Sequence, residues 1–280
     1  MTDLKSFFHK LKHEIDVSLP ESEREAISFL ILEHFGYSRE EILLGSPLSK
    51  ALPDVEQIIK RVNQNEPIQY VLGNAWFYGR SFFIRAGVLI PRPETELLIE
   101  IILKSNYSVS KLKVLDLGTG SGCIPVTLAL EQPKWEISAL DINPIALEVS
   151  RENAKIHQAD IDLRQGSMLR DLPHDLINLD VVVSNPPYIP FSDRVRMQPQ
   201  VVDFEPHDAL FVPDEDPLLF YKAILQIAKT RLKHAGQIYV EIQEGFGPQV
   251  IELFQKGGLT QVQKISDLDG KDRVVTAIKP

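Results

Sequence analysis

The chain of 280 residues carries 30 basic and 39 acidic side chains and has a net charge of −9. Its hydrophobic content of 44% is that of a globular protein, and its length supports one or two domains. The acidic balance argues against tight nucleic-acid binding, and the single cysteine, Cys123, excludes a disulfide framework and a cysteine-rich metal site. Without an apolar run of membrane-spanning length or a signal-peptide core, the sequence favours a cytoplasmic protein that makes no membrane contact.

Residues 1–75 form the first predicted domain, a small bundle of four or five helices. The stretch 20–36 begins with proline and ends with glycine, which is the usual asymmetry of a helix. Ser38 opens a shorter helix through a capping box, and residues 53–64 carry apolar side chains at helical spacing. The helical pattern alone does not distinguish a recognition domain from a module that serves only for packing.

Residues 76–90 alternate between apolar and polar side chains and contain Gly79 and Gly87, which predicts a β-hairpin that links two domains. The aromatic run 76–78 is a candidate substrate platform. An aromatic cluster at a domain junction is more often part of a core, and we favour that interpretation.

Residues 91–280 form the second predicted domain, in which strands alternate with helices. This alternation predicts a largely parallel, doubly wound α/β sheet. The predicted strands are residues 112–117, 136–141, 161–165, 180–184, 236–241, 261–266 and 273–278. The predicted helices are residues 124–131, 144–157, 217–233 and 247–256. Ligands of such sheets bind outside the carboxyl ends of the strands.

The first predicted strand of this domain runs into a glycine-rich turn, residues 118–122, at the start of a helix. Glycines allow backbone N–H groups to approach a ligand closely. The next strand ends in Asp141, about 20 residues after the turn, where an acceptor for a ribose diol belongs. The glycine spacing differs from the G-x-G-x-x-G fingerprint of dinucleotide sites, so a nucleoside site is favoured over a pyrophosphate cradle.

A later apolar strand ends in Asn185-Pro186-Pro187-Tyr188. Proline lacks an N–H and restricts the residue before it to extended geometry, so backbone carbonyls at this point are free to face a ligand. An amide side chain, a carbonyl and an aromatic face can together hold a planar NH2 group of an amide or a base. The alternative is a proline-rich turn that merely ends a strand.

Taken together, the turn 116–122 resembles the cofactor loop of class I S-adenosylmethionine-dependent methyltransferases. The motif 185–188 resembles that of their branch that methylates amide and exocyclic nitrogens. Residues 66–73, 77–79 and 88–96 are in turn similar to the PrmC/HemK family of protein-(glutamine-N5) methyltransferases.

The resemblance implies transfer of a methyl group from S-adenosyl-L-methionine, with S-adenosyl-L-homocysteine as product. The acceptor would be the side-chain amide N5 of the glutamine in the Gly-Gly-Gln motif of class 1 peptide chain release factors. It also implies a seven-stranded Rossmann-like sheet with an antiparallel last strand, and a substrate-recognition role for the helical domain. The enzyme is expected to be a monomer that makes no direct nucleic-acid contact. Its acidic surface would suit a basic partner.

By the same resemblance, site residues can be assigned. Asn185 and the Pro186 carbonyl would each accept one amide proton, and Tyr188 would cover the amide plane. Substrate contacts would come from Asn185, Pro186, Pro187 and Tyr188. The cofactor would contact Gly118, Thr119, Gly120, Ser121, Gly122, Asp141, Met168 and Asn185. No metal site is expected, because none of the seven histidines shows metal-ligand spacing with a partner on the same likely face. His9 and His13 are four residues apart, but no carboxylate–histidine motif joins them.

Two positions depart from the family pattern. The family often has an acid and then an aromatic residue after the third strand, whereas this chain has Ser167-Met168. A methionine can still pack on a purine as a polarizable apolar group. Residues 211–217 replace what is more often a glycine-rich loop, which would alter the rim of the substrate cleft.

Other functions stay open on these residues. A ribosomal-protein glutamine methyltransferase would differ mainly in what its N-terminal region recognises. A DNA adenine-N6 methyltransferase would use the same motif, but it would need a basic target-recognition domain and a base-flipping pocket. The glycine spacing disfavours a nicotinamide oxidoreductase. The intact motif 185–188 disfavours a non-catalytic protein that binds release factors or ribosomes.

Overall fold

A computed structural model describes residues 3–170 and 172–280. The chain divides into two compact units. The N-terminal unit contains the residues up to Asn74 together with Gln198–Phe204, and the larger unit contains Ala75–Met197 and Glu205–Pro280. No helix within the described ranges is long and apolar enough to cross a membrane.

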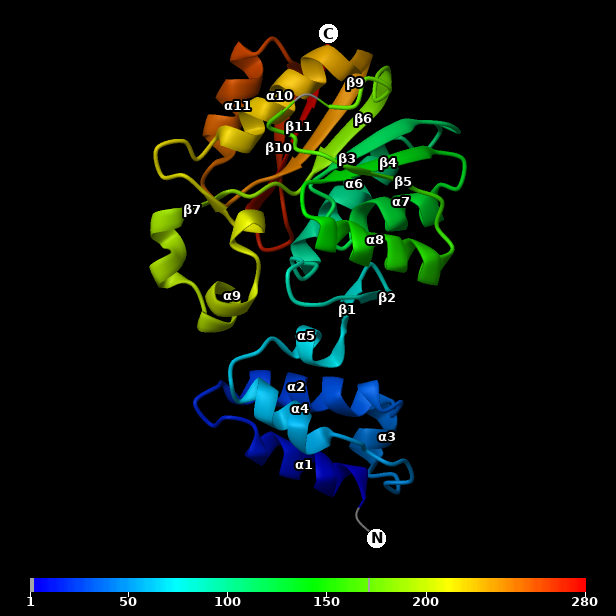
Figure 1. Cartoon of the computed structure of the whole chain (residues 1–280), viewed down its shortest axis with the longest axis vertical. Helices are drawn as coiled ribbons and strands as arrows, with labels where there is room; N and C mark the ends of the chain where they lie inside the picture. Colours follow the sequence, from blue (N-terminus) through cyan, green and yellow to red (C-terminus); the bar gives the residue numbers. More distant parts are fainter. Residues whose placement is uncertain (1–2, 171) are drawn as a thin grey trace. The chain divides into compact units, whose positions relative to one another are not determined.

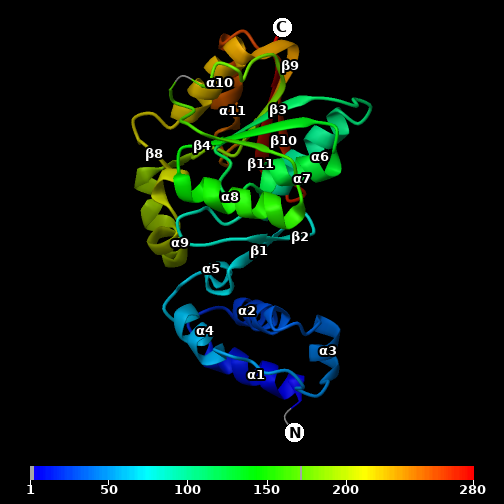
Figure 2. The same cartoon turned by 45° about the vertical axis from the view of Figure 1, so that its right-hand side comes forward.

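The N-terminal unit is helical, as predicted (Figures 1 and 2). Its helices are α1 (Leu4–Glu14), α2 (Glu21–His34), α3 (Arg39–Leu44), α4 (Val55–Val62), α5 (Ile68–Leu72) and α9 (Pro199–Phe204). Both halves of the predicted capping box are present at the start of α3: Ser38 accepts from the Glu41 N–H at 3.2 Å, and Glu41 accepts from the Ser38 N–H at 2.8 Å. Buried apolar side chains of α1 to α5 share one core.

A two-residue turn joins β1 (Asn74–Phe77) to β2 (Arg80–Phe83), which pair in the predicted hairpin. Tyr78 and Gly79 have φ values of +50° and +69°, the left-handed pair that suits the twist of a tight hairpin. Phe77 is 1% exposed and belongs to the core of the larger unit, in line with the favoured interpretation of the aromatic run. Trp76 is 61% exposed.

Seven strands of the described chain form the main sheet, in the order β10-β11-β9-β6-β3-β4-β5. They are β3 (Lys113–Leu117), β4 (Glu136–Asp141), β5 (Asp162–Gln165), β6 (Leu179–Ser184), β9 (Leu232–Glu241), β10 (Thr260–Ser266) and β11 (Asp272–Ile278). Strands β5, β4, β3, β6 and β9 pair in parallel. The last strand, β11, is antiparallel to both of its neighbours. The seven-stranded methyltransferase-type sheet is therefore confirmed.

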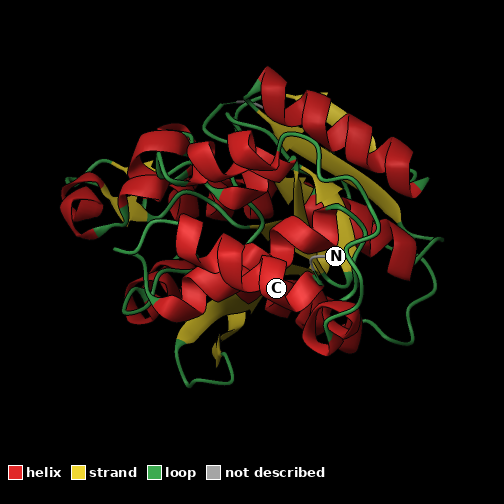
Figure 3. Ribbon diagram, turned by 90° about the horizontal axis from the view of Figure 1, so that it is seen from below, coloured by secondary structure: helices red, strands yellow, loops and turns green. Residues whose placement is uncertain are grey.

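Helices cover both faces of this sheet (Figure 3). They are α6 (Glu96–Ser105), α7 (Cys123–Glu131), α8 (Pro144–His157), α10 (Leu219–Arg231) and α11 (Gly247–Lys256). Side chains of a strand point alternately to the two faces. In β6, Val182 therefore packs with α10 and α11, whereas Val181 and Val183 pack with α6 and α7.

Short elements follow β2 and β6. They are η1 (Pro93–Thr95), β7 (Ile189–Pro190), η2 (Phe191–Arg196), η3 (His207–Ala209) and β8 (Phe211–Val212). β7 pairs in parallel with β8, so the chain returns to the end of the motif 185–188 after the intervening segment.

The predicted helix 217–233 is wrong at its end. Helix α10 stops at Arg231, and β9 begins at Leu232 rather than at residue 236. Leu232 has extended geometry and pairs with Leu179 of β6. An apolar residue at this position continues the helical pattern as well as it begins a strand, so the hydrophobic period alone could not locate the boundary.

Candidate functional site

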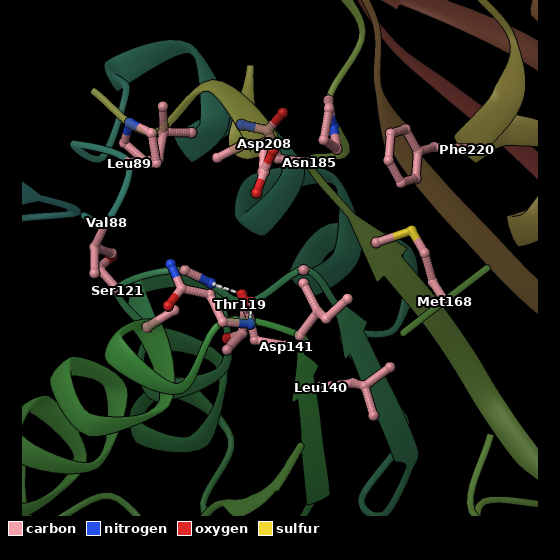
Figure 4. A pocket seen from close by; sticks show the side chains of 18 of the residues that line it. Val88, Leu89, Thr119, Ser121, Leu140, Asp141, Met168, Asn185, Asp208 and Phe220 are labelled. Atoms are coloured by element: carbon pink, nitrogen blue, oxygen red, sulfur yellow. Dashed lines mark hydrogen bonds between the residues drawn. The ribbon is translucent and has the colours of Figure 1, made fainter. Parts of the chain in front are cut away.

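A cavity of about 770 Å³ lies at the carboxyl ends of the central strands (Figure 4). Its size is that of a small-molecule site. The walls come from residues 87–95, the glycine turn after β3, the end of β4, residues 166–169, the motif after β6, and residues 206–220. All of these residues belong to the larger unit. The Ser184 hydroxyl, at the end of β6, donates to the Leu117 carbonyl, at the end of β3, at 2.6 Å, and so ties the two central segments together.

The turn after β3 is built on glycines in the left-handed region. Gly118, Gly120 and Gly122 have φ values of +76°, +57° and +80°, which other residues rarely adopt. A Cβ added at Gly122 would collide with the Ser150 hydroxyl of α8, so this glycine also allows close packing of the two segments. The turn leads directly into α7, whose first N–H groups have no side-chain cap.

Asp141, the last residue of β4, lines the cavity next to this turn (Figure 4). One carboxylate oxygen accepts from the Gly120 N–H at 2.8 Å, and the other accepts from the Asn143 N–H at 2.8 Å. Burial raises the pKa of Asp141, and these hydrogen bonds oppose that effect. Each carboxylate oxygen has a second lone pair, so the fixed carboxylate can still accept a hydrogen bond from a ligand hydroxyl.

Asp116 is fully buried in β3, one residue before the strand ends. Neither of its carboxylate oxygens has a hydrogen-bond partner among the described residues. Burial raises its pKa to about 7, the neighbouring Thr119 hydroxyl opposes that effect, and the Asp141 carboxylate adds to it. A positive charge nearby would favour the ionised form of such a group.

Met168 lies in an apolar wall of the cavity, close to Gly118. Leu140, Ile142 and Phe220 belong to the same lining (Figure 4 labels Leu140, Met168 and Phe220). Sequence reasoning proposed Met168 but missed the other three. Phe220 is on α10, where an aromatic residue in an amphipathic pattern gives no sign that it faces a cavity.

The four residues of the motif 185–188 are placed differently. Asn185 and Pro187 line the cavity, Pro186 is buried, and neither Pro186 nor Tyr188 is among the described lining residues. The Asn185 amide nitrogen donates to the Thr95 hydroxyl at 3.1 Å. The Tyr188 hydroxyl donates to Glu241 at 3.1 Å, and burial raises the pKa of this tyrosine. The substrate roles of these four residues stay predictions.

Glu241, the last residue of β9, lies beneath this motif with 2% of its surface exposed. It accepts from the Thr95 hydroxyl at 2.6 Å and from the Tyr188 hydroxyl at 3.1 Å. Burial raises its pKa to about 7, and the two hydrogen bonds oppose that effect. Sequence reasoning missed both Thr95 and Glu241. For Glu241 a signal was present, because it ends a predicted strand as Asp141 does.

A half-buried ion pair between Arg92 and Glu205 stabilises one part of the cavity rim. Arg92 donates to Glu205 at 2.6 Å, and the Ile90 N–H donates to the same carboxylate at 3.2 Å. The Glu205 side chain is 1% exposed. Segments 90–92 and 205–209, which both contribute to the cavity wall, are thereby tied together.

Two other sequence interpretations can be checked. Cys123 is a buried free thiol, and burial raises its pKa to about 12, so it is not an activated nucleophile. Of the residues proposed from the loop 211–217 as rim elements, Phe211 and Pro213 line the cavity. Across the described ranges, no group of three or more histidine, cysteine or acidic side chains is arranged to hold a metal ion.

Comparisons with known proteins agree on a methyltransferase. The profile of the family "Methyltransferase small domain" matches residues 93–202. The chain is 38% identical over 262 residues to a release factor glutamine methyltransferase of Bacteroides thetaiotaomicron, covering 92% of this chain and 94% of the relative. It is 41% identical over 222 residues to one of Streptococcus pneumoniae, covering 79% and 78%. A crystal structure of a methyltransferase from Pyrococcus furiosus shares the fold, with a TM-score of 0.55 and 16% identity over 81% of this chain and 98% of that one.

Proposed function

Because this chain belongs to the family of release factor glutamine methyltransferases, we propose that it methylates class 1 peptide chain release factors. The methyl group passes from S-adenosyl-L-methionine to the side-chain amide N5 of the glutamine in their Gly-Gly-Gln motif. The observation that supports this most strongly is the single cavity onto which the glycine turn, Asp141 and Asn185 all open.

The residues around the cavity fit S-adenosylmethionine. The clearest sign is Asp141, a lining carboxylate that the Gly120 and Asn143 N–H groups fix and that can still accept from a hydroxyl, because this ligand carries a ribose diol. Asp116 is fully buried and is not among the lining residues, so it would act on the positive charges of the ligand only at a distance. The lining residues of the glycine turn, Gly118 to Ser121, would contact the ligand, Asp141 would accept from its ribose hydroxyls, and Met168 would pack on its base. Once bound, the ligand supplies an electrophilic methyl group on a positively charged sulfur.

At the acceptor, the main task of the protein is to orient the glutamine amide nitrogen. A glutamine amide nitrogen is a weak nucleophile, because its lone pair is delocalised into the carbonyl. Asn185 Oδ1 and the Pro186 carbonyl each accept one amide proton and direct the nitrogen at the methyl group. Holding reactants in line can lower a barrier by about 7–11 kcal/mol. The same acceptors stabilise the positive charge that develops on nitrogen, and the ring of Tyr188 adds a cation–π attraction.

No general base is required before the methyl group transfers. The amide nitrogen forms a bond to the methyl carbon while the carbon–sulfur bond breaks, and the alkylated nitrogen then loses one proton. The alkylated amide is strongly acidic, so water can accept this proton. The acceptor oxygens of Asn185 and Pro186 therefore need only to orient and stabilise.

The helical region 1–75 is proposed to recognise the body of the release factor, residues 76–90 to link, and residues 91–280 to carry out the transfer. A net charge of −9 suits a partner with the basic surface that a ribosome-binding protein needs. The enzyme would work as a monomer in the cytoplasm, without direct contact to nucleic acid.

The proposal is tested by methyl transfer from radiolabelled S-adenosylmethionine to a purified release factor. We expect label on the wild-type factor and none on a matched factor whose Gly-Gly-Gln glutamine is changed to alanine. Ribosomal proteins and duplex DNA are offered in parallel reactions. Label on either of these, with an unlabelled release factor, would replace the proposal with the corresponding alternative.

A further inference from the structure

We propose that Glu241 is a positioning residue for methyl transfer, which acts through Thr95 to fix the amide of Asn185 with its oxygen towards the cavity. The inference rests on the proposed function and adds to it a residue outside the motif 185–188. It starts from one continuous chain of hydrogen bonds: Asn185 Nδ2 donates to Thr95 Oγ1 at 3.1 Å, and Thr95 Oγ1 donates to Glu241 Oε2 at 2.6 Å.

The direction of each hydrogen bond follows from the chemistry of the three groups. An ionised carboxylate can only accept, and a threonine hydroxyl has a single proton to donate. Since that proton goes to Glu241, Thr95 can only accept from Asn185. The amide of Asn185 must then turn its nitrogen to Thr95, and its oxygen is left for the cavity that Asn185 lines.

The orientation matters because the acceptor substrate offers an NH2 group. An Asn185 amide in the opposite orientation would place its own NH2 against the NH2 of the substrate, so the aiming hydrogen bond would be replaced by a repulsive donor–donor contact. Nothing in the Asn-Pro-Pro-Tyr sequence by itself selects between the two orientations. In this structure, Thr95 and Glu241 make the selection.

The other oxygen of the same carboxylate contacts the other end of the motif 185–188. The Tyr188 hydroxyl donates to Glu241 Oε1 at 3.1 Å, so both oxygens of Glu241 hold groups from residues 185–188, one directly and one through Thr95. The strand end is fixed in turn, because the Tyr221 hydroxyl donates to the Glu241 main-chain carbonyl at 3.0 Å. The carboxylate is therefore well placed to orient the motif as a unit.

The arrangement depends on the ionisation of Glu241. A protonated carboxyl group can donate to Thr95, which frees the threonine proton for the oxygen of Asn185 and permits the wrong orientation. The titratable and charged groups that act on this carboxyl or share its surroundings are Glu94, Cys123, Tyr188, Tyr221 and Arg273. Burial sets the pKa of Glu241 at about 7, so turnover is expected to rise with pH through this region.

The first test compares Thr95→Val with Thr95→Ser in the full-length enzyme, with release factor as acceptor. Valine keeps the shape but removes the hydroxyl, and serine keeps the hydroxyl. We expect kcat to fall by about 30-fold or more in Thr95→Val and to return to within about fivefold of wild type in Thr95→Ser. The KM for release factor and the Kd for S-adenosylmethionine should stay within about threefold. Wild-type kcat in Thr95→Val overturns the proposal.

The second test uses Glu241→Gln, which can still accept from Thr95 but does not titrate. At saturating S-adenosylmethionine the cationic ligand should lower the pKa of Asp116 well below 7, so the wild-type profile of kcat against pH should contain an inflection near 7 from Glu241 that is missing in Glu241→Gln. An unchanged inflection would overturn the role of Glu241.

A third readout needs no acceptor and so separates this proposal from the proposed function. NMR should detect a slowly exchanging side-chain amide proton of Asn185 in wild type and in Thr95→Ser, and fast exchange in Thr95→Val. Failure of the wild-type enzyme to label release factor would refute the proposed function. The exchange data would still test the hydrogen-bond chain from Asn185 through Thr95 to Glu241. Equal exchange in wild type and Thr95→Val would contradict it.

Discussion

On the proposed cofactor side of the cavity, the key carboxylate is held by backbone groups that are near in sequence. On the proposed acceptor side, the key carboxylate is held by side chains that are distant in sequence. Asp141 accepts from N–H groups 2 and 21 residues away. Glu241 accepts from hydroxyl groups 53 and 146 residues away. A short strand–turn–helix–strand unit therefore suffices for the first half of the site, while the second half exists only once β6, β9 and the segment before α6 have come together.

This difference predicts that substitutions on the two sides affect different steps. The proposed cofactor side should govern affinity for S-adenosylmethionine, because Asp141 and the glycine turn are the residues proposed to contact that ligand. The proposed acceptor side should govern the rate of transfer, because Asn185 is proposed to orient the reacting nitrogen.

The largest effect is expected for Asn185→Ala, which removes the aiming oxygen. Turnover should fall by at least about a hundredfold. Binding of release factor should change little, because the recognition surface proposed on residues 1–75 is untouched. Asn185→Asp serves as a control with intermediate turnover, since it keeps an acceptor towards the cavity but presents a second acceptor to Thr95. Steady-state labelling at saturating release factor measures both. Near-normal turnover of Asn185→Ala would show that the motif 185–188 is only a turn that ends a strand.

A smaller effect, on binding rather than rate, is expected for Asp141→Ala. Loss of a charged hydrogen bond to a hydroxyl costs about 1.5–3 kcal/mol, so affinity for S-adenosylmethionine should fall roughly ten- to a hundredfold. The Gly120 N–H also loses its acceptor, which loosens the turn. Calorimetric titration gives the Kd directly, and unchanged affinity would remove Asp141 from the cofactor site.

The buried acid on the acceptor side should also make the fold sensitive to pH. The pKa of Glu241 is about 7 in the folded protein and about 4.5 for an ordinary glutamate. Between these two pKa values, Glu241 has lost its proton in the unfolded chain but retains it in the folded chain. The free energy of unfolding therefore falls as pH rises from about 4.5 to 7, and it levels off above pH 7. Glu241→Gln should remove a contribution on the order of 3 kcal/mol from that fall.

Urea unfolding at pH 5 and pH 8 measures this contribution, with the wild-type protein as reference. If wild type and Glu241→Gln lose the same free energy of unfolding between the two pH values, the pKa of Glu241 is not raised in the folded protein. That result would contradict the buried arrangement of this carboxyl group.

The smallest effect is expected for proton release when S-adenosylmethionine binds. The pKa of Asp116 is about 7 in the free protein, and a cationic ligand would lower it, so binding near pH 7 should release a fraction of a proton. Calorimetry in two buffers of different ionisation enthalpy detects this release. Asp116→Asn should bind with none, and an equal release in both proteins would place the titrating group elsewhere.

The two sides also differ in how far the sequence revealed them. That the glycine turn and Asp141 meet at one cavity could be predicted, because both lie in one contiguous strand–turn–helix–strand pattern. Asn185 could be predicted from the prolines that follow it. Thr95 and Glu241 could not be paired, since they are 146 residues apart and meet only because η1 and the end of β9 are neighbours in the fold.

Boundaries and cavity walls were harder to predict for a related reason. The end of α10 at Arg231 was missed because Leu232 satisfies both a helical and a strand pattern. Phe220 was missed because hydrophobic periodicity identifies a buried face without showing whether core or cavity lies beyond it.

The most direct test of the division between the two sides compares Asp141→Ala with Asn185→Ala. For each variant, two quantities are measured: the Kd for S-adenosylmethionine, and the single-turnover rate of methyl transfer to release factor at saturating cofactor. We expect Asp141→Ala to weaken binding about tenfold or more with a rate near that of wild type, and Asn185→Ala to slow transfer about a hundredfold with nearly unchanged binding. If each substitution lowers both quantities to a similar degree, the division of the site into a binding side and an aiming side is contradicted.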